Sequence, residues 1–121
     1  MLTDEFARHF AAEWIAAWNA RDLPRVLAHY RDDFEMGSPL IAQIAGEPSG
    51  VLRGKPAIAA YWQAALARFP DLHFSLQQVC KGAESIVLVY SRAGGGTAAE
   101  VFYFDGQGLV YRSAGHYAVV M

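Results

Sequence analysis

The chain of 121 residues is 54% hydrophobic and has a formal net charge of -2, which suits one domain over residues 1–121 with a substantial core. It contains no run of Lys or Arg and no uninterrupted apolar stretch of about 18 residues, so we expect neither a nucleic-acid partner nor a membrane partner. The single cysteine, Cys80, excludes an internal disulfide and is compatible with a cytoplasmic protein.

The N-terminal half of the chain predicts helices. Apolar side chains recur at helical spacing over residues 3–20, and Thr3 can cap this first helix. Asp22 can cap a second, shorter helix. A third apolar stripe runs over residues 54–69 and ends at Pro70. These patterns predict two helices in a hairpin and a third helix later in the chain.

The segment between the second and third helices has a weaker pattern. Phe34-Glu35-Met36 predicts a short strand, which Gly37-Ser38-Pro39 stops. From Leu40 to Arg53 no periodicity is visible, and glycine, proline and serine cluster near its end. We therefore expect a loop here that can cover an opening in the fold.

The C-terminal half predicts strands. Apolar and polar residues alternate over residues 72–77, and residues 86–90 form a continuous β-branched and aromatic run. Two further strands are expected over residues 99–104 and 109–120, with a turn between them. The predicted fold class is α+β, with three helices packed in a curved, mainly antiparallel sheet.

Glu100 is the unusual residue of the strand over residues 99–104. The side chains that follow it are apolar or aromatic in both alternating sets, so both faces of this strand look covered. A carboxylate in such a place must find a hydrogen-bond partner, line a cavity or keep its proton. Two alternatives follow: a pocket acid or base, or an ordinary carboxylate at an exposed strand end, paired with Arg92 or Arg112.

Five segments spread over essentially the whole chain carry a family resemblance. They are WIAAWNARDL at 14–23, YRDDF at 30–34, GKPAIAAYW at 54–62, PDLHF at 70–74 and FYFDGQG at 102–108. Together they resemble the nuclear transport factor 2-like superfamily, specifically its SnoaL-like and ketosteroid-isomerase-like members. The resemblance implies a cone-shaped α+β barrel with a deep apolar pocket between helices and sheet, and a homodimer paired through the outer face of the sheet.

The resemblance is partial at the catalytic positions. The general-base aspartate of the ketosteroid isomerases falls at Ser38, their phenolic oxyanion donor at Trp14 and a supporting tyrosine at Trp62. Glu100 alone keeps an acid, at the position where the isomerases use a protonated carboxyl. The same isomerisation is therefore not expected. The SnoaL-like polyketide cyclases imply a histidine and an aspartate on the last strands, where this chain has His116 but no aspartate after it.

Two catalytic candidates and six pocket residues follow from these observations. Glu100 would be the acid or base, and His116 a base or proton shuttle, although His116 would face away from the pocket if Gly115 and Tyr117 face into it. The residues expected to line the ligand pocket are Trp14, Trp18, Ser38, Trp62, Phe102 and Tyr117. No pair of histidines has metal-ligand spacing and no nucleotide-binding glycine motif is present, so neither a metal nor a cofactor is expected.

Two functions of different classes remain open. The first is a SnoaL-like protein that binds an apolar or aromatic small molecule and catalyses a cofactor-free proton transfer such as isomerisation or cyclisation. The second is a non-catalytic ligand-binding or dimerisation module that keeps the fold without the family's catalytic residues. Fold alone does not decide between them.

Overall fold

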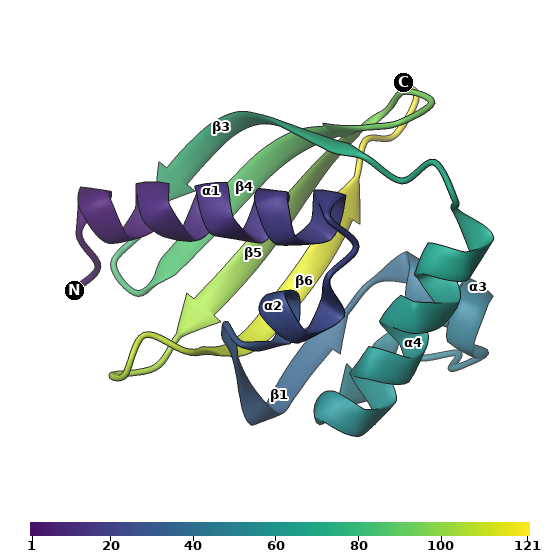
Figure 1. The fold of residues 1–121 in the computed structure, drawn as a ribbon, viewed down its shortest axis with the longest axis horizontal. Coiled ribbons are helices and arrows are strands. Elements are labelled where there is room, and N and C mark those ends of the chain that lie inside the picture. Colours follow the sequence, from purple (N-terminus) through teal and green to yellow (C-terminus); the bar gives the residue numbers. More distant parts are fainter.

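The computed structural model of the protein describes residues 1–121, which form four helices and six strands (Figure 1). The helices are α1 (Asp4–Asn19), α2 (Leu23–Leu27), α3 (Pro39–Ala45) and α4 (Lys55–Arg68). The strands are β1 (Tyr30–Gly37), β2 (Val51–Arg53), β3 (Phe74–Lys81), β4 (Ser85–Arg92), β5 (Thr97–Phe104) and β6 (Val110–Tyr117).

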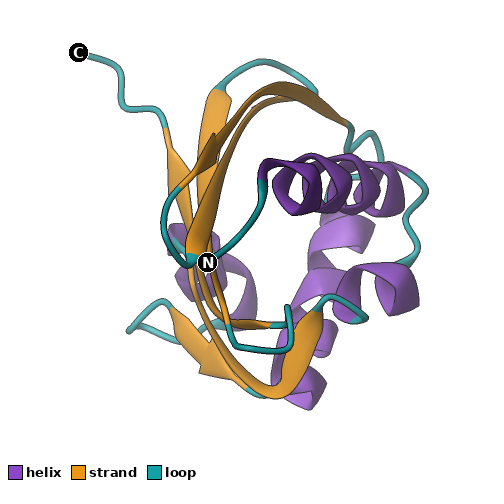
Figure 2. Ribbon diagram, turned by 90° about the vertical axis from the view of Figure 1, so that its left-hand side faces the viewer, coloured by secondary structure: helices purple, strands orange, loops and turns teal.

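All six strands belong to one open sheet with the order β2-β1-β6-β5-β4-β3. Strand β1 runs parallel to β6, and every other neighbouring pair is antiparallel. The sheet curves around α1, so that this helix lies on its concave side (Figure 2). The predicted α+β fold, with helices packed in a curved and mainly antiparallel sheet, is confirmed.

The prediction of a loop from Leu40 to Arg53 is wrong, because this segment contributes to both α3 and β2. Ser38 caps α3 by accepting a hydrogen bond from the backbone N–H of Leu40, and Pro39 occupies the first turn. Gly46 ends the helix in the left-handed region, with φ of 73°. Glycine and proline here mark the ends of a short helix, and β2 pairs with the far edge of a β1 that is longer than expected.

The outer face of the sheet exposes two large aromatic side chains. Tyr103 of β5 and Tyr111 of β6 are each about two-fifths exposed, at 37% and 40%. Pairing of two copies through this face stays a prediction. No helix of the protein combines the length and the apolar character that crossing a membrane requires.

Helix α1 is fixed to the sheet by aromatic packing and by one polar anchor. Phe10 and Trp14 are almost completely buried and meet Phe102 of β5 edge to face, with ring centroids 4.9 and 5.2 Å apart. At the C-terminal end of α1, the side-chain amide of Asn19 donates to the carbonyl of Phe74 and accepts from its N–H, both at 2.8 Å. This anchor fixes the first residue of β3 against α1.

Replacing Asn19 with alanine should lower the free energy of unfolding by about 1–3 kcal/mol, because both partly buried backbone groups of Phe74 lose their partner. Urea denaturation would measure the change, and the exposed Gln63→Ala on α4 is the matched control. An Asn19→Ala loss no larger than that of the control would show that the anchor contributes nothing.

Candidate functional site

A cavity of about 370 Å³ lies between the helices and the inner face of the sheet. Its walls are mainly aromatic, and they include Trp14, Trp18, Trp62 and Phe74. Its mouth is formed by residues 68–73, which lead from α4 into β3, and by residues 92–94 at the end of β4. The cavity therefore has an apolar body and a more polar entrance, as small-molecule sites commonly do.

Glu100 lies on the inner face of β5 and lines this cavity. Its side chain is only 4% exposed, and it alternates with Ala98 and Phe102, which are buried on the same face. No cation pairs with it: Arg112 lies beside Glu35, with Nε 3.7 Å from the carboxylate, and Arg92 makes no ion pair. The alternative of a carboxylate at an exposed strand end, paired with an arginine, therefore does not describe Glu100.

Hydroxyl groups from several elements surround this carboxyl. Tyr90 of β4 donates a hydrogen bond to Glu100 Oε1 at 3.2 Å. Gly115 of β6 lies directly opposite Glu100, and a Cβ placed on this glycine would lie within 3.6 Å of Glu100 Oε1, Ser38 Oγ and the Tyr117 hydroxyl. The absence of a side chain at Gly115 thus leaves open the space on which these three oxygen-bearing groups converge.

Two further tyrosines, Tyr61 and Tyr30, belong to the group of hydroxyl-bearing side chains near the Glu100 carboxyl. Tyr61 of α4 lines the cavity together with Tyr90 and Tyr117. Tyr30 of β1 is fully buried, and its hydroxyl accepts a hydrogen bond from Trp14 Nε1 at 3.0 Å. We call Tyr30, Tyr61, Tyr90 and Tyr117 the phenol cluster.

Burial controls the ionisation of these groups. It raises the pKa of the Glu100 carboxyl to about 7, and the hydrogen bond from Tyr90 opposes this rise. Burial, followed by the nearby charge of Glu100, raises the pKa of Tyr90 and of Tyr30 well above the ordinary value. The pKa of Tyr117 is raised by the same two causes. Near pH 7, Glu100 can therefore lose or gain a proton while these phenols remain hydrogen-bond donors.

The other residues named from the sequence occupy different places. Trp14, Trp18, Trp62 and Tyr117 line the cavity. Ser38 lies behind Tyr117, with its Oγ 3.5 Å from the phenol oxygen. Phe102 is fully buried in the core beneath the cavity and does not line it.

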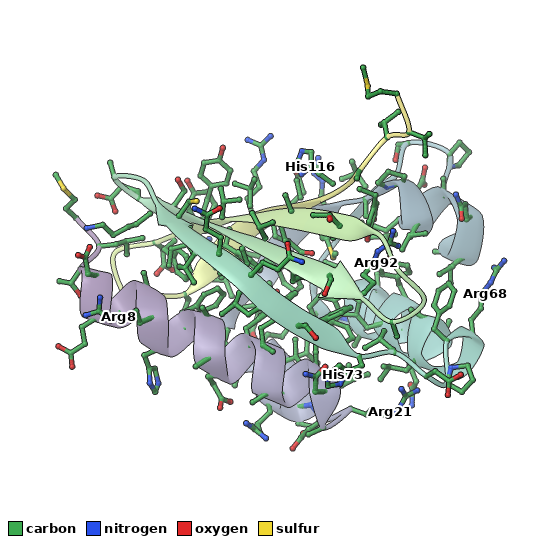
Figure 3. All side chains as sticks on the ribbon, turned by 90° about the horizontal axis from the view of Figure 1, so that it is seen from above. Arg8, Arg21, Arg68, His73, Arg92 and His116 are labelled. Atoms are coloured by element: carbon green, nitrogen blue, oxygen red, sulfur yellow. The ribbon has the colours of Figure 1, made fainter.

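His116 is exposed and stands on the face of the sheet away from α1 (Figure 3). It pairs with Ala99, one of the residues of β5 that face outward, and it does not line the cavity. The alternation of His116 with Gly115 and Tyr117 along the strand indicated this orientation. No group of three or more His, Cys, Asp or Glu side chains lies close enough together to hold a metal ion.

Sequence reasoning missed Tyr30, Tyr61 and Tyr90. Tyr90 could have been found, because strict alternation along β4 places it on the same face as the buried Ile86 and Leu88. Tyr30 lies outside the short strand that was expected, and Tyr61 stands beside Trp62 in the apolar stripe of α4.

Comparison with known proteins agrees with the fold. The model of the SnoaL-like domain family matches residues 11–120. The chain belongs to the SnoaL-like domain family. A SnoaL-like protein of unknown function from Burkholderia thailandensis E264 is 50% identical, with 97% of this chain and 98% of that chain covered and a TM-score of 0.92.

More distant solved structures share the nuclear transport factor 2-like fold. A candidate isomerase of the SnoaL-like family from Agrobacterium tumefaciens strain C58 is 18% identical, with 95% and 99% of the two chains covered and a TM-score of 0.75. TerC, co-crystallised with polyporic acid, is 12% identical, with 93% and 92% covered and a TM-score of 0.77. A search of curated proteins found no match. At these identities the structural likeness supports the fold alone.

The raised pKa of Glu100 makes stability depend on pH. As pH rises from 4.5, the ordinary pKa of a glutamate carboxyl, toward about 7, the carboxyl ionises in the unfolded chain but stays protonated in the folded one, so stability falls. Wild-type protein should lose this stability and Glu100→Gln should not, so the unfolding free energy of the variant minus that of wild type should rise by about 3 kcal/mol between pH 4 and pH 8. Urea denaturation across this range measures the rise.

The exposed Glu84→Gln is the control for this measurement, because it makes the same substitution at a surface position. If the Glu100→Gln difference changed with pH no more than that of the control, the carboxyl would not titrate between these limits in the folded protein.

Proposed function

We propose that this SnoaL-like protein binds an apolar or aromatic small molecule in the cavity and catalyses a cofactor-free proton transfer on it, with Glu100 as the acid and base. The observation that supports this most directly is a buried carboxyl, with a pKa near 7, in the wall of an aromatic cavity. A base is most efficient when its pKa lies near the working pH, because it is then both partly ionised and basic enough to accept a proton.

The proposed reaction begins at a carbon next to a carbonyl group of the ligand. The Glu100 carboxylate removes a proton from this carbon, and the electron pair moves onto the carbonyl oxygen to form an enolate. Tyr61 and Tyr117 line the cavity and can donate hydrogen bonds to that oxygen, because their raised pKa values keep them protonated. Where the enolate is conjugated with a double bond, return of the proton from Glu100 to the far carbon gives an isomer. Where the enolate carbon attacks a second carbonyl group, a ring forms, and the alkoxide that results takes the proton from Glu100.

Tyr90 acts on this chemistry through Glu100. Its hydrogen bond to Oε1 fixes the orientation of the carboxyl and favours the ionised form, which lowers the pKa. Trp14 is already committed, because its indole N–H donates to Tyr30. Trp14 therefore serves as part of the cavity wall and not as a free donor to the ligand.

A ligand-binding module without catalysis is the second candidate. It is favoured by the residue at the base position of the isomerases, because Ser38 cannot hold an abstracted proton as a carboxylate does and its Oγ already caps α3. In that case Glu100 would act as a hydrogen-bonding group for the ligand, and bound ligand would leave unchanged.

Deuterium exchange separates the two candidates. With 2-tetralone, an aromatic ketone with activated C–H bonds, we expect the protein to accelerate exchange in D₂O, followed by proton NMR. Glu100→Gln should slow the protein-dependent rate by at least about a hundredfold, because the amide cannot accept the proton. The exposed Glu84→Gln is the control and should exchange like wild type. Bound 2-tetralone that exchanges no faster than in buffer would contradict catalysis and favour the binding module.

Replacing Tyr90 with phenylalanine tests whether the hydrogen bond from Tyr90 lowers the pKa of Glu100. Loss of the hydrogen bond should raise the pKa of Glu100, so the midpoint of the exchange rate against pH should move upward from about 7. The control is Tyr103→Phe on the outer face of the same sheet, which should leave the midpoint in place. A midpoint unchanged in Tyr90→Phe would mean that another group controls the titration.

A further inference from the structure

Arg92, at the mouth of the cavity, is a cation without an anionic partner. Its side chain lines the cavity and makes no ion pair and no hydrogen bond, and its Nε is buried without a partner. The other partly buried arginine, Arg31, pairs with Asp33 at 2.8 Å. An unsatisfied N–H on a charged group is costly when water is excluded, so a missing partner at this position is informative.

The guanidinium of Arg92 is also held in position. Its Cζ lies 4.6 Å from the centre of the Tyr117 ring, within the range of a cation–π interaction. On another side it packs against Gly96, where an added Cβ would come within 2.9 Å of one terminal nitrogen. Gly96, with φ of 97°, therefore provides both the turn and the room for this side chain. A cation fixed before binding loses less conformational entropy when a ligand arrives.

The position of Arg92 relative to Glu100 defines two ends of the site. Arg92 is the last residue of β4, and Tyr90, the donor to Glu100, precedes it by two residues on the same face. The aromatic walls of Trp14, Trp18 and Trp62 form the apolar body of the same cavity. A ligand that satisfies both ends needs an anionic group at the mouth and a proton-transferring carbon or oxygen deeper inside.

The charge around the mouth favours a single negative charge on the ligand. Arg68 and His73 also line the mouth, but Arg68 is exposed and projects from α4 away from the body of the molecule (Figure 3). Asp71 adds a negative charge there, and no cation pairs with it. Together with the carboxyl of Glu100, it disfavours a doubly charged group such as a phosphate monoester. A carboxylate matches the planar fork of a guanidinium and carries one charge.

We propose that the ligand is an aromatic or similarly flat apolar carboxylic acid, whose carboxylate binds Arg92 while its body lies between the tryptophans with the reacting group toward Glu100. This inference rests on the proposed function, since it specifies the class of molecule that would occupy the same cavity. It assigns Arg92 to ligand binding and specificity and gives it no part in proton transfer.

A matched pair of probes tests the inference by isothermal titration calorimetry. 2-Naphthoate carries the carboxylate, and 2-naphthamide has nearly the same shape without the charge. Wild-type protein should bind the naphthoate at least about tenfold more tightly than the amide, as expected for a charge-assisted, bidentate contact. Arg92→Gln should remove this preference while leaving the affinity for the amide nearly unchanged. Arg92→Lys, which keeps the charge but loses the fork, should give an intermediate preference.

Arg68→Gln is the matched control, because it removes the same charge from the same mouth at an exposed position. It should keep the wild-type preference. Equal binding of the two probes by wild type, or a preference that survives in Arg92→Gln, would overturn the assignment of Arg92 while leaving the binding cavity intact. Failure of both probes to bind wild-type protein would instead contradict the proposed function, and the inference with it.

Discussion

Most of the site depends on the burial of one carboxyl without a cation. Glu100 is 4% exposed and is contacted by a phenol where a buried carboxylate would ordinarily meet a lysine or arginine. An ion pair would have fixed the negative charge and lowered the pKa, whereas burial beside hydroxyl donors raises it to about 7. The carboxyl can therefore exchange its proton near neutral pH. As a consequence, the folded protein is less stable at high pH, where the buried carboxyl must ionise.

The sheet provides the conditions for this burial through its register. Glu100 lies between Leu88 on β4 and Gly115 on β6, so one neighbour is apolar and the other has no side chain. The space left at Gly115 allows Ser38 and Tyr117 to approach the carboxyl from outside β5. The aromatic packing of α1 then closes the far side and keeps bulk water out. The site is thus assembled by residues that are distant in sequence and adjacent only in the folded sheet.

This dependence on register explains what could be predicted from the sequence. Periodicity identified the two long apolar stripes of α1 and α4 and the exceptional character of Glu100, because both are local patterns. Alternation along β4 can place Tyr90 on a buried face, but that Tyr90 and Arg92 border the cavity beside Glu100 depends on how β4 aligns with β5 and β6. The error at residues 40–53 has a different cause: Ser38 and Pro39, which begin α3, were interpreted only as the end of a strand, and Gly46, which ends the helix, as part of a loop.

One strand, β4, carries both the residue proposed to bind the ligand and the residue that contacts the proton-exchanging carboxyl, at separate places. On the inner face of β4, Tyr90 contacts the carboxyl and Arg92, two residues further on, reaches the mouth. If both residues met Glu100, the cation would lower the pKa of the carboxyl and reduce its value as a base near pH 7. Stacking of the guanidinium on Tyr117 keeps Arg92 at the entrance instead. A cation held at this distance can bind an anionic ligand while the carboxyl remains a group that exchanges its proton.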